Sequence, residues 1–193
     1  MSVDPPARIG RLDISTLHVR HMGMAQEITD GYAVTAAVCM SRHHKSPKTW
    51  TVQTDSQPPV PYEVDWLPPT PAHVRSCANK DEATRDGAYG LALAAADAHL
   101  GLVALRRSEG KSGSDFYLIS AGTHVSPDPH LDLERDDLVR LEVSGIDRDD
   151  DASMRARVHQ KVRQAVAGRS PFPAIAGVAG FLSARVVFRR AKD

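Results

Sequence analysis

Apolar and polar positions alternate along the first part of the chain in the way that β-strands require. The alternation is visible over residues 12–19 and stronger over residues 32–40, and residues 50–53 form a third short run of the same kind. β-Branched and aromatic residues, which strands favour, are frequent in these runs. The pattern therefore predicts an N-terminal antiparallel β meander.

A proline-rich stretch follows the predicted meander. Six prolines fall within residues 55–72, and proline lacks the N–H group that a strand or helix needs. We expect an extended connector over the surface. The chain then divides into an N-terminal β extension with its connector, residues 1–72, and a core of residues 73–193, which together form one compact domain.

The second part of the chain alternates between helical and strand patterns. Asn79, followed by Glu82, resembles a capping box and begins an Ala- and Leu-rich helix that continues to about His99, and Gly101 stops it. We expect strands at 102–105, 116–119, 138–146 and 184–190, a second helix at 149–167, and connections at 121–136 and 171–180. The order helix, three strands, helix, strand predicts an α/β (α+β) fold with a mixed sheet flanked by helices.

Composition limits the classes of function. Lys+Arg and Asp+Glu are both 24, so the formal net charge is zero, and any basic surface for nucleic acid must be local. The two cysteines form no CxxC pair, which excludes the usual zinc knuckle and a disulfide framework. No apolar run approaches the ~18 residues of a membrane span, and Asp4, Pro5 and Pro6 do not form a signal sequence. We therefore expect a cytoplasmic protein with no membrane partner.

Two carboxylates are the candidates for chemistry. Asp115 stands where the Gly-rich turn of residues 109–113 enters a predicted strand, and Glu142 lies in the middle of the next strand. If the strands form a hairpin, both carboxylates can lie near each other, as ligands of a hard divalent cation must. Glu142 is flanked by Leu141 and Val143, so the alternation equally allows it to face solvent.

The element order and these acids resemble the PD-(D/E)XK nuclease superfamily. The residues concerned are Glu82, Asp115 and the Glu-Val-Ser string of residues 142–144, within roughly residues 79–190. The strings around them also resemble a set of uncharacterised bacterial proteins. The resemblance implies an α-β-β-β-α-β core, Mg²⁺ or Mn²⁺ held by Glu82, Asp115 and Glu142, and cleavage of nucleic acid.

The chain departs from the superfamily pattern at one position. Ser144 stands where the pattern has lysine, and a serine cannot supply a positive charge. Lys111 or Lys161 would then supply the catalytic cation from another element, as happens in some members of the superfamily. Glu82 has a competing role as the third helical residue of the predicted capping box.

The predicted second helix carries a candidate surface for nucleic acid. Arg157, Lys161 and Gln164 share one helix face by their spacing and could contact a phosphate backbone. The alternative is a solvated helix face. Two functions remain open: a Mg²⁺-dependent nuclease, whose N-terminal meander helps to bind substrate or a partner, and an inactive nuclease-like module that binds a protein partner or forms a homo-oligomer. Ser144 and the neutral net charge favour the second.

Overall fold

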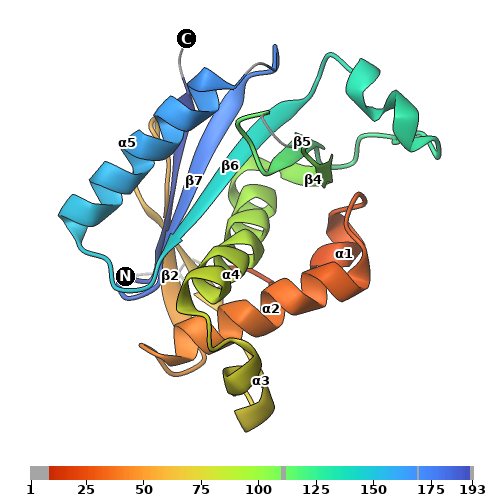
Figure 1. Cartoon of the computed structure of the whole chain (residues 1–193). Helices are drawn as coiled ribbons and strands as arrows, with labels where there is room; N and C mark the ends of the chain where they lie inside the picture. The colour runs from red at the N-terminus through yellow and green to blue at the C-terminus, as the bar shows by residue number, and fades with distance from the viewer. Residues whose placement is uncertain (1–8, 110–111, 169, 192–193) are drawn as a thin grey trace, which may run out of the picture.

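One eight-stranded mixed β-sheet runs through the computed structural model, which describes residues 9–109, 112–168 and 170–191 (Figure 1). The strand order is β1-β3-β2-β8-β7-β6-β5-β4. The strands are β1 Gly10–Arg11, β2 Lys48–Gln53, β3 Val60–Val64, β4 Leu102–Arg107, β5 Phe116–Ser120, β6 Val139–Ile146, β7 Ala174–Gly180 and β8 Arg185–Ala191. The helices are α1 Leu17–Arg20, α2 Gln26–Ser41, α3 Pro71–Ser76, α4 Lys80–Ala95 and α5 Asp151–Ala167, with a π-helical turn η1 Ala96–Leu100 and a 3-10 turn η2 Pro129–Glu134.

Helices cover both faces of the sheet. In Figure 1, α5 lies over one face, while α4, with α2 beside it, lies over the other. Strands β6 and β7 are parallel neighbours, and α5 is the crossover between them. Side chains of β6 therefore alternate between the two helical layers: Leu141 and Val143 join the core beneath α4, while Glu142 and Ser144 contact α5.

Helix α4 begins at the predicted Asn79 cap, and its π-helical extension stops at the predicted Gly101, but among the described residues the Glu82 side chain makes no return bond to Asn79, so the capping box is only half formed. The Asn79 side chain accepts hydrogen bonds from the backbone N–H groups of Asp81 and Glu82, at 3.2 and 3.4 Å. Gly101 follows η1 with φ +64°, the left-handed conformation that glycine adopts readily. The structure also contains the predicted second helix and the strands predicted at 102–105, 116–119 and 138–146, with small shifts of their ends.

The predicted N-terminal meander is wrong. Residues 32–40 belong to helix α2, whose buried positions include Thr29, Tyr32 and Ala36, the spacing of a helix face. Helix α2 packs closely on α4 because α4 has glycine at the contact: a Cβ on Gly87 or Gly90 would stand only 3.1 or 3.2 Å from α2 backbone atoms. This close contact between two helices buries the residues that the sequence pattern assigned to a strand.

The first strand and the proline-rich connector also differ from the prediction. Residues 12–19 form no strand, and β1 is a two-residue strand that pairs in parallel with β3. Strand β3 lies inside the expected connector and contains Pro61. Because β1 covers only Tyr62 and Glu63, Pro61 needs no donor on that side. Strand β2 pairs in parallel with β8, so the sheet is continuous from the N-terminal part of the chain to the core.

Strand β7 occupies a stretch that the sequence predicts as a connection. Its seven residues, Ala174–Gly180, are all buried in the middle of the sheet. They are small because the space is limited: a Cβ on Gly177 would lie 3.0 Å from the Phe188 ring, and one on Gly180 would lie 2.5 Å from the Asp149 carboxylate. The core thus has two strands after α5, β7 and β8, where the sequence predicts one.

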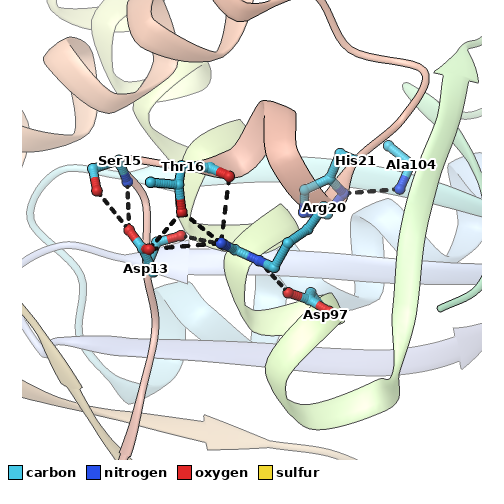
Figure 2. Close-up of polar contacts among 7 residues, drawn as sticks. All are labelled: Asp13, Ser15, Thr16, Arg20, His21, Asp97 and Ala104. Atoms are coloured by element: carbon cyan, nitrogen blue, oxygen red, sulfur yellow. Dashed lines mark hydrogen bonds and ion pairs between the residues drawn. The ribbon is translucent and has the colours of Figure 1, made fainter. Parts of the chain in front are cut away.

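The outer edge of β4 is covered by the segment that follows α1. His21 is fully buried and its Nδ1 accepts a hydrogen bond of 2.8 Å from the Ala104 N–H, while Gly23 N–H donates to the Ala104 carbonyl at 3.1 Å. Figure 2 shows His21 beside β4, with the Arg20 guanidinium held by Asp97, Thr16 and the Asp13 carbonyl. These bonds occupy the backbone groups of an edge strand, which would otherwise be free to pair with another chain.

Among the described residues, no helix combines the length and apolar character that crossing a membrane requires.

Candidate functional site

A cavity of about 1050 Å³ lies at the edge of β6, between α4 and α5. Strand β5 pairs with β6 only over Val139, Arg140 and Leu141, so residues 142–146 extend past its beginning. The exposed edge of this extension forms one wall of the cavity. Among the described residues, five acidic and five basic side chains line it: Asp81, Glu109, Asp115, Glu142 and Asp147, with Lys80, Arg85, Arg107, Arg157 and Lys161.

Asp115 is held at the point where β5 and β6 separate. Its backbone N–H donates to the Leu141 carbonyl at 2.8 Å, which continues the ladder by one bond. Beyond this bond the Asp115 side chain, and not the backbone of β5, pairs with β6: Oδ2 accepts the Val143 N–H at 2.8 Å. Oδ1 accepts a hydrogen bond of 2.7 Å from the Tyr89 hydroxyl of α4. Both carboxylate oxygens are therefore fixed, and the carboxylate lines the cavity.

Glu142 is buried in the middle of β6 with an exposed fraction of 3%. Its Oε1 accepts a hydrogen bond of 2.6 Å from the Lys161 ammonium of α5. Burial raises the pKa of Glu142 and the nearby Asp115 charge raises it further, while Lys161 lowers it. The alternative that Glu142 faces solvent is therefore wrong: it faces α5 and is close enough to Asp115 for their charges to interact.

Basic side chains on one face of α5 contact polar side chains of β6. Arg157 donates to the Ser144 hydroxyl at 2.8 Å, and Lys161 contacts Glu142 two residues earlier on the strand. Lys161 also donates to the Gln164 side chain at 3.1 Å. The three residues predicted to share a helix face therefore do so and line the cavity. A fully solvated face is excluded for Arg157 and Lys161.

One other predicted site residue, Glu82, lies outside the cavity wall. Glu82 is exposed in the first turn of α4 and is not among the residues that line the cavity, where Asp81 takes part instead. Lys111 is outside the described residues. In the part of the chain that the structure describes, no group of three or more His, Cys, Asp or Glu side chains is placed to hold a metal ion. Of the acids that line the cavity, Asp115 and Glu142 are the pair whose charges interact, and in the described residues no third acid joins them to form a metal-binding group.

This pair nevertheless suits a hard divalent cation. Mg²⁺ in proteins is often bound through one or two carboxylates, with water and substrate phosphate completing its coordination. Asp115 is prevented from rotating by two hydrogen bonds, and Glu142 is on a central strand, so both are positioned by rigid elements. The donor set is consistent with Mg²⁺ or Mn²⁺ and contains neither thiolate nor imidazole.

Sequence reasoning missed two residues of the site, Tyr89 and Arg107. Tyr89 is buried on α4 and orients Asp115 through its hydroxyl. The Arg107 guanidinium, at the end of β4, lies 5.1 Å from the Tyr89 ring centroid and 5.4 Å from that of Phe116. Both contacts join elements that are distant in sequence, and no local motif marks them.

Comparison with protein-family models, with curated proteins and with solved structures found no match to this chain. The function has to be inferred from the geometry and chemistry of the cavity. The cavity is polar and contains fixed charges of both signs, so it fits a charged ligand better than an apolar one.

Proposed function

We propose that the protein is a metal-dependent hydrolase of nucleic-acid phosphodiester bonds. The observation that carries the proposal is the convergence of Asp115 and Glu142 on one cavity, with the Lys161 ammonium in contact with Glu142. Carboxylates can hold a metal ion that activates water and neutralises phosphoryl charge, and an adjacent cation can stabilise the charge of the transition state.

The arrangement of the surrounding elements supports the proposal. The chain runs α4, β4, β5, β6, α5, β7, and these strands are consecutive in the sheet. This is the α-β-β-β-α-β order that the resemblance to the PD-(D/E)XK superfamily implies, with Asp115 directly before β5 and Glu142 on the adjacent strand β6. Glu82 departs from the expected metal set, since it lies outside the cavity wall.

Five residues of the cavity have a role in this proposal. Asp115 and Glu142 would hold Mg²⁺ or Mn²⁺, and such an ion lowers the pKa of bound water and neutralises phosphate charge. Lys161 supplies the cation that Ser144 cannot, and its ammonium is held beside Glu142 by a 2.6 Å bond. Arg157 and Gln164 stand on the same helix face, where they can contact the phosphate backbone and fix its position.

Calorimetry with Mn²⁺ tests the metal site without knowledge of the substrate. We expect the wild type to bind the ion and both Asp115→Asn and Glu142→Gln to lose that binding. Glu142→Gln keeps an oxygen for Lys161, so its fold is preserved. Glu82→Gln is the matched control, because it removes an exposed carboxylate outside the cavity wall. Absence of Mn²⁺ binding by the folded wild type would overturn the proposal.

Cleavage assays then test the reaction. Plasmid DNA, single-stranded DNA and RNA are incubated with the wild type and each variant in Mg²⁺ or Mn²⁺. We expect cleavage of at least one substrate by the wild type and by Glu82→Gln, and none by Glu142→Gln. Cleavage that persists in Glu142→Gln would show that another site, or a contaminant, is responsible.

A second candidate is a nuclease-like module without activity that binds a protein partner or forms a homo-oligomer. It is favoured by one observation: the Lys161 ammonium already has two side-chain acceptors, Glu142 and Gln164, while Ser144 stands at the expected lysine position. Charged side chains that pair with one another can stabilise the fold without any catalytic role. Mn²⁺ binding without cleavage of any nucleic acid would support this candidate over the first.

A further inference from the structure

A second hollow of about 570 Å³ lies between α2 and α4, beside the cavity that contains Asp115 and Glu142. Three residues line both spaces: Arg85, Tyr89 and Arg107. The two hollows therefore meet at these residues. A ligand that extends beyond the first cavity on this side passes over them.

Arg107 is a fixed cation at this junction. Its guanidinium donates to the Tyr32 hydroxyl at 2.6 Å and stacks near the rings of Tyr89 and Phe116. In the described part of the chain, no carboxylate lies within ion-pair distance of it. A guanidinium has five N–H donors, and among the described residues the Arg107 guanidinium donates only to the Tyr32 hydroxyl, so it has further donors for an anion.

The surroundings of Arg107 indicate that its charge is available to a ligand. The residue is exposed, so its charge is not needed to satisfy a buried acid. It is nevertheless held still by one hydrogen bond and two rings, which lowers the entropy lost when it binds a ligand. The neighbouring Arg106 is different, because its guanidinium is paired with Glu109 at 2.6 Å.

Arg85 provides a second cation on the other side of the junction. Its side chain is 55% exposed and pairs with the adjacent Asp86 at 2.9 Å. The charges of Arg85 and Arg107 both act on the buried hydroxyls of Tyr32 and Tyr89, where each opposes the burial that raises the tyrosine pKa. The two guanidinium groups therefore flank the same pair of tyrosines.

We infer that Arg107, assisted by Arg85, forms a phosphate subsite that binds a nucleic-acid strand next to the bond held at Asp115 and Glu142. The inference rests on the proposed function and adds to it a phosphate-binding position at the edge of the cavity and the direction in which the substrate strand leaves. Tyr89 joins the two positions, because its ring stacks with Arg107 and its hydroxyl holds Asp115. The strand would leave the cavity over the hollow between α2 and α4.

The salt dependence of binding tests this subsite. Binding of a fluorescent single-stranded oligothymidylate is measured without metal at several salt concentrations, for the wild type and for Arg107→Gln, Arg85→Gln and Arg106→Gln. Each phosphate contact contributes about 0.7 to the slope of log K against log salt for single strands. We expect Arg107→Gln to reduce the slope by about 0.7 and to weaken binding several-fold. The matched control Arg106→Gln should keep the wild-type slope.

Three results decide the inference. A slope in Arg107→Gln equal to that of Arg106→Gln overturns it, and so does a wild type that shows no salt-dependent binding. If Arg107→Gln does not fold, the exposed Arg85→Gln decides, and an unchanged slope there overturns the inference. Calorimetry with Mn²⁺ keeps the two proposals apart, because the Arg107 and Arg85 variants retain both carboxylates of the metal site.

Discussion

The Lys161 ammonium lies 2.6 Å from Oε1 of Glu142, and the two residues come from the crossover helix and the central strand that it covers. The Lys161 side chain is 16% exposed and the Glu142 side chain 4%. An ion pair as buried as this has lost most of its hydration, so each charge depends on the other. The apolar positions of α5, Met154 and Val158, pack on β7 and β8, which leaves its polar side over β6.

Replacing Lys161 with methionine should destabilise the protein at neutral pH. The variant leaves the Glu142 charge buried without its cation, and we expect the free energy of unfolding to fall by about 3 kcal/mol at pH 7.5. Urea unfolding of Lys161→Met and wild type gives the difference directly. Lys48→Met, which changes an exposed lysine of β2, is the control and should have little effect.

The pH dependence of that loss follows from the pKa of Glu142. Burial raises this pKa above its ordinary value of 4.5, and Lys161 opposes the rise, so removal of Lys161 raises it further. The folded variant then holds a proton more tightly than the unfolded chain. The stability that this proton gives the variant is fully present below pH 4.5 and is lost as the pH rises through the pKa of Glu142 in the folded variant. A deficit in Lys161→Met that is as large at pH 4.5 as at pH 7.5 contradicts this assignment.

Tyr89→Phe should loosen Asp115 without disturbing the core. The substitution removes the hydroxyl that donates to Asp115 Oδ1 at 2.7 Å but keeps the ring, which packs edge-on against Tyr32 and Phe116. We expect a loss of about 1 kcal/mol in the free energy of unfolding. Groups that orient a metal ligand typically contribute about 10–100-fold to metal affinity. Calorimetry should therefore show weaker Mn²⁺ binding, with Tyr117→Phe, a buried tyrosine outside the cavity wall, as the control.

Arg140→Met should destabilise the turn that leads to Asp115. The buried guanidinium donates to the carbonyls of Phe172, Ser112 and Ala165, at 2.8, 3.0 and 3.0 Å. Three carbonyls then lose a charged donor, and we expect about 3 kcal/mol less stability. Arg135→Met removes a partly exposed arginine, which pairs with Asp137 and donates to one backbone carbonyl, that of His124, and should lower the urea midpoint much less. Equal midpoints for both variants would show that the Arg140 bonds contribute little.

Local sequence signals located the core elements correctly where they are strong. The Asn79 cap and Gly101 stop mark α4, and the alternation around Glu142 marks β6. The sequence also singled out Asp115, at the entry to a strand, and Glu142, inside one, and both line the cavity; their role in metal binding stays a prediction. Their approach in the structure follows from the antiparallel pairing of β5 with β6.

The remaining errors come from contacts between distant segments. Residues 32–40 alternate like a strand, but the approach of α2 to Gly87 and Gly90 of α4 makes a helix the better way to bury them. Strand β7 is built of small residues because Phe188 and Asp149 leave no room, and alanine and glycine carry little strand signal. Arg107 meets Tyr32 and Tyr89 only after the sheet and both helices have formed.

His21 should make the protein sensitive to mild acid. Its ring is fully buried against β4, Nδ1 accepts the Ala104 N–H, and burial lowers its pKa from 6.5 to about 4, with Arg20 lowering it and Asp97 raising it. As the pH falls, His21 is protonated in the unfolded chain before it is protonated in the folded protein. The stability contributed by neutral His21 is therefore fully present above pH 6.5 and is lost towards pH 4. The shift corresponds to about 3 kcal/mol over this window. His21→Asn keeps an acceptor for Ala104 and removes the titration, so its urea midpoint should fall less than the wild-type midpoint between pH 7 and pH 4.5. An equal decline in both proteins would assign the acid sensitivity to other groups.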